Sequence, residues 1–229
     1  EYEHRFIYLS VTNPNTRKTW LNNNLGAEYA DINSPNFNPA QQATTGKDYK
    51  AYGSLFQWGR KADGHELIDR TNRRVKRGAT DTKSNDPTDA LFIKDGADKA
   101  DWRVDSDETL WANETSANNV CPKGYRLPKG GAEGQDKEWE LEVASWNDTI
   151  KADLAALAST LKLTMAGIRN HSDGNVISVG NFGDYWSANP FSGGSYSHNL
   201  VFNRDSDKKE SDGTPTTKAN VKSFEYFDR

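Results

Sequence analysis

Large apolar residues occur mostly singly or in pairs along this chain, separated by runs of polar residues. The longest periodic pattern lies in residues 136–162, where apolar side chains recur every three or four positions and predict a helical region with one apolar face. This face is expected to contribute to the core. Asp148 lies within the run and could cap a second helix if the first one ends there. The residues that form the face are Trp139, Val143, Trp146, Ile150, Leu154, Leu157 and Leu161.

Short strands are predicted on both sides of this region. Before it, Phe6, Tyr8 and Val11 alternate with polar residues, and residues 19–21 restart a strand after the turn at Asn13. The other predicted segments are a long loop at 28–50, an aromatic strand or turn at 52–58, a tight turn at 62–65, and strands at 163–168, 177–179, 184–188, 199–202 and 221–227.

A helical region followed by a run of hairpins is typical of the α+β class. Because no internal repeat and no clean linker divides the sequence, we expect residues 1–229 to form a single α+β domain. Hydrophobic residues make up only 34% of the chain, which is low for a core of this size. Seven Trp, nine Tyr and nine Phe compensate, since each ring buries a large area. The predicted core is therefore aromatic and lies beneath a polar surface of loops.

The net charge of −4 argues against nucleic acid as a partner. The basic run at 70–77 is predicted to be a solvated loop, with contact to an anion or polysaccharide as the alternative. Cys121 is the only cysteine, which excludes an internal disulfide and a thiolate zinc site. Since no histidine is near it in sequence, we expect a buried, inert thiol.

Nothing in the sequence approaches the ~20 apolar residues of a membrane span, so membrane insertion is not expected. The chain begins at Glu1 without a signal peptide. We therefore expect a module of a longer exported protein, whose export signal lies outside these residues.

Short signature segments follow one another in a fixed order, and most place a large ring beside a glycine or proline. A ring of this kind is expected to anchor the chain where the backbone turns sharply. None of the segments contains the parts of a known catalytic machine. They are Lys-Thr-Trp-Leu-Asn-Asn-Asn-Leu-Gly at 18–26, Tyr-Gly-Ser-Leu-Phe-Gln-Trp-Gly-Arg-Lys-Ala-Asp-Gly-His at 52–65, Cys-Pro-Lys-Gly-Tyr-Arg-Leu-Pro at 121–128, Ala-Gly-Ile-Arg-Asn at 166–170 and Gly-Asp-Tyr-Trp-Ser at 183–187.

The order of these segments resembles the Fibrobacter succinogenes major paralogous domain, a family of extracellular bacterial modules. The resemblance spans about the whole chain, although residues 67–119 and 205–217 carry no family pattern. It implies a divergent C-type-lectin-like fold. Related modules are the peptide-binding domains of large calcium-dependent (RTX) adhesins. The resemblance therefore implies a monomeric adhesin module, secreted or on the bacterial cell surface, that binds a peptide or a protein C-terminus on another cell with the help of calcium.

Two other functions stay open. The lectin-like fold that the resemblance implies would also suit a glycan-binding module. A glycan-degrading enzyme needs only two suitably spaced carboxylates, and the chain has 33 acidic residues. The four histidines are scattered without metal-binding spacing, and His65, at the end of the 62–65 turn, is interpreted as structural. Binding is favoured over catalysis, because no nucleophile or acid–base pair is recognisable.

Calcium candidates are sought in oxygen-rich loops, because Ca²⁺ takes six to eight oxygen ligands. Asp205 and Asp207 alternate with other residues in a loop that continues to further acids, although the spacing is not that of an EF-hand. Asp105 and Asp107 form a second crowded group. Ordinary surface acids are the alternative for each group, and Asp63 and Asp173 are further single candidates.

Ligand contact is expected in and after residues 184–199, a segment with flexible Gly/Ser spacing, tyrosines and asparagines. Such a composition is typical of recognition loops, because tyrosine provides contact area at low entropic cost. Trp186 is predicted to be a core anchor. The predicted contacts are Asp184, Tyr185, Asn189, Tyr196 and Asn203.

Overall fold

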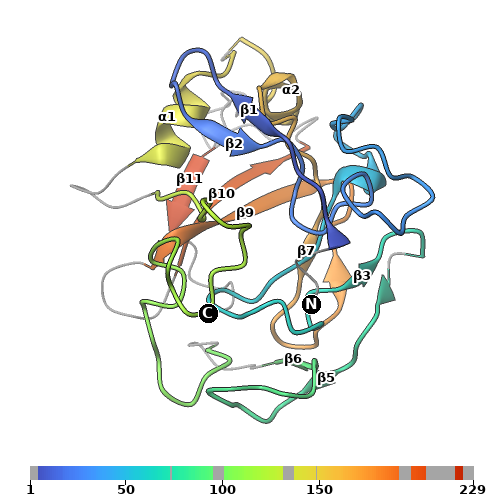
Figure 1. Cartoon of the computed structure of the whole chain (residues 1–229), viewed down its shortest axis with the longest axis vertical. Helices are drawn as coiled ribbons and strands as arrows, with labels where there is room; N and C mark the ends of the chain where they lie inside the picture. The colour runs from blue at the N-terminus through green and yellow to red at the C-terminus, as the bar shows by residue number, and fades with distance from the viewer. Residues whose placement is uncertain are drawn as a thin grey trace, which may run out of the picture.

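The computed structural model describes residues 5–72, 74–94, 101–130, 137–147, 149–190 and 197–204, and the backbone of 220–223. Its largest sheet is antiparallel with the strand order β11-β10-β9. Figure 1 shows the helices and the β1–β2 hairpin at one end, this sheet across the middle, and β5 and β6 at the other end. The strands are β9 (Phe182–Pro190), β10 (Ser197–Asn203) and β11 (Asn220–Ser223), and the helices are α1 (Glu138–Ala144) and α2 (Ala152–Ala158).

The remaining regular elements are short and form two-stranded pairs, antiparallel except for β5 and β6. Helices and short, mainly antiparallel strands together make an α+β arrangement, as predicted. Long loops connect the elements, including most of residues 28–50. These elements are β1 (Ser10–Thr12), β2 (Thr19–Leu21), a 3-10 turn at Tyr49–Ala51, β3 (Ile68–Asp69), β4 (Arg74–Val75), β5 (Ala79–Thr80), β6 (Phe92–Ile93), β7 (Ile168–Arg169) and β8 (Val176–Ile177).

Strand β9 lies between two aromatic clusters. Tyr185 packs with the cluster under the helices, which contains Trp139 and Phe202. The next residue, Trp186, points the other way and packs with Trp58 and its neighbours. Because successive side chains of a strand point to opposite faces, this pair of rings anchors β9 to both halves of the core.

Tryptophan side chains tie the signature segments to the sheet. The Nε1–H of Trp58 donates to the carbonyl of Ser187 at 2.9 Å, and that of Trp186 donates to the carbonyl of Phe56 at 2.9 Å. Trp102 donates in the same way to Trp58 at 2.8 Å. Trp58 and Trp102 are buried, Trp186 is half-buried, and the single polar atom of each is satisfied. For Trp58 and Trp186 this is the anchoring role that the sequence predicts.

The predicted helical region is two helices with a break between them. Trp139 and Leu161 are buried as predicted, but Leu154 is 50% exposed, so the prediction for this residue is wrong. The buried face of α2 is formed instead by alanines, with Ala152 and Ala156 in the cluster under β10. Small side chains allow the helix to approach the sheet closely, which turns the leucine outward. Asp148 lies outside the described residues.

Some strand predictions also need correction. The first strand is shorter than predicted, because Phe6 forms only an isolated bridge with Asp31. Of the strand predicted at 163–168, only the last residue is in a strand, because β7 begins at Ile168. The break has a physical cause at Gly167, whose φ is 76° and where a Cβ atom would lie 2.4 Å from the carbonyl oxygen of Ile177. This backbone is open only to glycine.

Arg70, in the basic run predicted to be a solvated loop, is buried. Its guanidinium donates to the carbonyl of Gly53 at 2.6 and 2.9 Å and to that of Ala166 at 2.9 Å, and it lies over the ring of Tyr52. Burial lowers its pKa to about 10. Arg70 therefore connects two signature segments, and the loop prediction is wrong for this residue.

Candidate functional site

An aromatic cavity of about 250 Å³ opens to solvent in the middle of the molecule. All five signature segments contribute to its wall, together with α1 and the chain before β7. Ligand pockets typically combine such apolar walls with a few polar groups. The residues that the segments contribute are Thr19–Leu21 and Asn23–Leu25, Tyr52 and Ser54–Phe56, Cys121 and Tyr125–Pro128, Ala166–Arg169, and Asp184–Trp186.

Asp184 supplies a carboxyl group to this cavity. The side chain is half-buried and lines the cavity, and burial raises its pKa to about 7. The Nδ2 of Asn199, on the neighbouring strand, donates to its Oδ1 at 2.7 Å. No cation among the described residues pairs with it. The predicted contact Asp184 therefore lies at a cavity, as an acid whose hydrogen-bond partner is a neutral amide.

Tyr185 also lines the cavity, but its hydroxyl is already engaged. It donates to the carbonyl of Thr164 at 2.8 Å and accepts from the backbone N–H of Thr164 at 2.9 Å. The ring stacks on Phe202 with a centroid distance of 6.0 Å. Tyr185 can thus offer a ligand its ring surface, while its polar end holds the chain before β7.

The other predicted ligand contacts do not join these two. Asn189 uses both ends of its amide on Gly130, accepting from the N–H at 3.0 Å and donating to the carbonyl at 2.7 Å. Asn203 is exposed at the end of β10. Tyr196 lies outside the described residues. The structure therefore places Asp184 and Tyr185 at one cavity and the two asparagines elsewhere.

The predicted calcium ligands are not gathered into a site in the part of the chain that the structure describes. Asp105 accepts a hydrogen bond from the Nδ2 of Asn85 at 2.8 Å. Asp107 accepts from the N–H and the hydroxyl of Thr109 at 2.9 and 2.6 Å. Asp205 and Asp207 lie outside the described residues.

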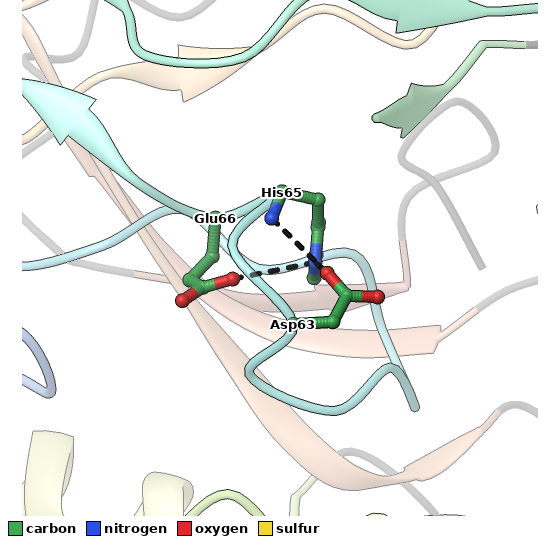
Figure 2. Close-up of side chains that lie close together, drawn as sticks. All are labelled: Asp63, His65 and Glu66. Carbon is green, nitrogen blue, oxygen red and sulfur yellow. Dashed lines mark hydrogen bonds and ion pairs between the residues drawn. The ribbon is translucent and has the colours of Figure 1, made fainter. Parts of the chain in front are cut away.

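A different group of possible metal ligands lies in the 62–65 turn and just after it. Figure 2 shows Asp63 and Glu66 on either side of the imidazole of His65. Their ligand atoms lie within 4.8 Å of one another, so the three residues could hold a metal ion. His65 is fully buried. Among the described residues, these are the three His, Cys, Asp or Glu side chains that lie close enough together to hold a metal ion.

The hydrogen bonds of these three residues argue against calcium binding at this group. The Nε2 of His65 accepts from the N–H of Gln57 at 3.0 Å, so the ring carries its proton on Nδ1, which donates to Asp63 at 2.7 Å. The other oxygen of Asp63 accepts from Arg60 at 2.7 Å. A metal ion would have to displace the Nδ1 proton, and two carboxylates with one nitrogen do not match the oxygen shell of Ca²⁺. Burial lowers the pKa of His65 to about 4, in keeping with the structural role predicted for it.

A second cavity, of about 380 Å³, is polar. Its charges largely satisfy one another or hold neighbouring loops. Arg5 pairs with Asp31, Glu28 accepts from Asn36, and Asp69 accepts from Asn72. Because its polar groups are engaged within the protein, the aromatic cavity is the better candidate site.

Two residues at or beside the aromatic site were not named as ligand contacts. Asn199 ended the predicted recognition segment and began a predicted strand, and antiparallel pairing of 184–188 with 199–202 would have placed it near Asp184. Cys121 was predicted to be an inert thiol, and burial does raise its pKa to about 12, but it also lines the cavity. Neither role has a local sequence signal, because each depends on which segments meet.

Within the described residues, no helix has the length and apolar character needed to cross a membrane. Comparison of the chain with protein-family models, with curated proteins and with solved structures gave no match.

Proposed function

We propose that this chain is a ligand-binding module of an extracellular bacterial adhesin, with a divergent C-type-lectin-like fold, and that the aromatic cavity is its binding site. One observation carries the proposal: the five signature segments that underlie the family resemblance all contribute to the wall of this one cavity. Segments that served folding alone would have no need to surround an opening to solvent.

A peptide side chain suits this cavity better than a sugar. Its volume of about 250 Å³ is below the ~300–1,000 Å³ typical of pockets for drug-sized ligands, which fits a single side chain or a similarly small group. A sugar presents hydroxyls on all sides, whereas the walls here are mostly apolar and include several aromatic rings. The proposed ligand is therefore a peptide or the end of a protein on another cell, with a glycan as the alternative.

Calcium is proposed to bind in the loops and not in the cavity. Asp205 and Asp207, with Asp105 and Asp107, are the residues proposed to hold it. A terminal carboxylate would be repelled by ionised Asp184 in the cavity. If the ligand is a protein C-terminus, its carboxylate is accordingly proposed to meet calcium at the loops while a side chain enters the cavity.

The test uses a matched pair of surface variants. Thr19 lines the cavity and is exposed on β2, and its partner Thr12 on β1 is exposed but does not line the cavity. Their hydroxyls lie 3.0 Å apart, so Thr19→Trp and Thr12→Trp lose the same hydrogen bond. Only the first places a large ring at the cavity.

The wild-type chain and both variants are screened against a peptide array in calcium, and again with excess chelator. We expect peptides that bind the wild type and Thr12→Trp but bind Thr19→Trp at least about tenfold more weakly, equivalent to ~1.4 kcal/mol. Loss of binding in chelator would support the calcium part. Equal binding by all three proteins would refute the cavity as the site, and competition by simple sugars would favour the glycan alternative.

A further inference from the structure

Asp184 and Asn199 form a pair of side chains with more acceptors than donors. Asp184 accepts one hydrogen bond from Asn199, and no other described residue donates to its carboxylate. Asn199 is fully buried, and its Oδ1 has no hydrogen-bond partner. The Oδ1 of Asn199 thus lacks a donor at a buried position, where an unpaired polar atom is costly, and the neighbouring carboxylate of Asp184 accepts only one hydrogen bond.

The surroundings of this pair favour a positive charge. The face of an aromatic ring is electron-rich, and cations are attracted to it within about 6 Å. Trp186, two residues along the strand from Asp184, lines the same cavity, as do Phe56 and Trp111. A carboxylate beside several rings is the arrangement that recognises an ammonium group.

The two arginines that line the cavity, Arg126 and Arg169, interact with partners other than Asp184. The guanidinium of Arg126 donates to both oxygens of Glu138, at 2.7 and 3.0 Å. That of Arg169 donates to backbone carbonyls, including that of Gly174 at 2.8 Å, and lies over the ring of Phe92. Burial raises the pKa values of Cys121 and Tyr185, which also line the cavity, so these two side chains are neutral near pH 7. Asp184 is therefore the group at this cavity that lacks a counterion.

We propose that the aromatic cavity recognises a primary ammonium group of its peptide ligand, held by Asp184, whose carboxylate Asn199 positions from the neighbouring strand. This inference rests on the proposed function, since it names the group that enters the proposed site. Two sources carry the same chemistry, a lysine side chain and a chain N-terminus. The experiment below distinguishes them.

Binding is measured by calorimetry with the whole chain and four peptides of the form Gly-X-Gly-amide. Two have acetylated N-termini, with lysine or norleucine as X. The other two have the same X residues and free N-termini. Norleucine keeps the aliphatic stem of lysine and lacks the charge, so the acetylated pair isolates the side-chain ammonium. The free norleucine peptide isolates the terminal one.

At pH 8 we expect the preferred ammonium peptide to bind at least about 30-fold more tightly than acetylated norleucine, the scale of a buried charge pair. Asp184→Asn should remove that preference and leave norleucine binding unchanged. Asp81→Asn, which changes the same charge at a side chain that is 80% exposed, should retain it. A proton on Asp184 competes with the ligand, so the wild-type preference should also shrink at pH 5.5, which tests the idea even if Asp184→Asn does not fold.

The outcomes separate the two proposals. If all peptides bind the wild type equally and Asp184→Asn changes nothing, the ammonium inference is wrong while a peptide site remains. If none of these peptides binds and the array finds no peptide sensitive to Thr19→Trp, the proposed function fails and the inference falls with it. If array peptides sensitive to Thr19→Trp contain neither lysine nor a free N-terminus, the inference alone is overturned.

Discussion

Replacing Asp184 by asparagine should change how the stability of the protein depends on pH. The asparagine Oδ1 can accept the hydrogen bond from Asn199 that Asp184 accepts now, so the packing is kept and only the titration is removed. Burial raises the pKa of Asp184 from 3.8 to about 7. The folded state therefore binds the proton more tightly than the unfolded state.

The direction of the pH dependence of stability follows from proton linkage. Because the folded state holds the proton up to about pH 7, the free energy of unfolding is highest below pH 4 and falls as the pH rises towards 7. The full loss corresponds to about 4 kcal/mol, at about 1.4 kcal/mol for each pH unit. About 3 kcal/mol of this falls between pH 5 and pH 8. Domains are stable by only ~5–15 kcal/mol, so the effect is measurable.

The assay is urea unfolding followed by tryptophan fluorescence at pH 5, 6, 7 and 8. The stability of Asp184→Asn relative to the wild type should increase by about 3 kcal/mol from pH 5 to pH 8. Asp81→Asn serves as the control, because it removes the same charge at a side chain that is 80% exposed and pairs only with Lys94 among the described residues. A difference for Asp184→Asn that stays constant over this range would show that Asp184 is not buried in the way described.

Three further predictions test the packing, the thiol and the calcium proposal. Ala156→Leu should destabilise the fold by about 1–3 kcal/mol through overpacking beneath β10, whereas Leu154→Ala, at an exposed position, should change urea stability by less than about 1 kcal/mol. Cys121 should react with a disulfide reagent much more slowly than a free thiol at pH 8, because its pKa is about 12, and unfolding in urea should remove the protection. Chelator should lower the thermal unfolding midpoint of the wild type but not that of the Asp205→Asn/Asp207→Asn double variant; an equal drop in both would place the metal elsewhere.

The local sequence predicted which aromatic rings anchor the core better than it predicted which face of a helix is buried. The rings of Trp58 and Trp186 were expected to be core anchors, and they are, because a large ring beside a sharp turn has few other places to lie. The burial of α2 was predicted from leucine spacing and proved wrong at Leu154. Spacing cannot distinguish an alanine face from a leucine face when close approach to a sheet, a tertiary effect, decides the orientation.

At the candidate site, too, the sequence predicted the residues with a local signal and not those whose role depends on distant segments. Asp184 and Tyr185 were singled out from composition, and both line the cavity. Asn199 ended the predicted recognition segment but was not named as a contact, because its pairing with Asp184 depends on the register of β9 and β10. Arg70 was misjudged because its carbonyl partners lie 17 and 96 positions away. A polar residue that is buried by distant segments has no signature in its own neighbourhood.

His65 should produce a pH dependence opposite to that of Asp184. Burial lowers its pKa from 6.5 to about 4, so the unfolded state binds the proton more tightly and the free energy of unfolding falls as the pH drops below 6.5. The full effect is about 3 kcal/mol, and it acts over nearly the same range as that of Asp184 with the reverse sign. The two groups therefore largely cancel in the wild type.

Between pH 4 and pH 7 the contributions of Asp184 and His65 to the stability of the wild-type protein should accordingly offset each other. Each single variant should reveal the pH dependence that the other group produces. The free energy of unfolding of Asp184→Asn should fall as the pH is lowered. That of His65→Gln, whose side chain can still accept from the N–H of Gln57, should fall as the pH rises towards neutral. Glu66, whose pKa burial also raises, adds to the slope that Asp184 produces. Parallel profiles for the two variants would contradict this assignment, because only groups with opposite proton linkage can separate them in this way.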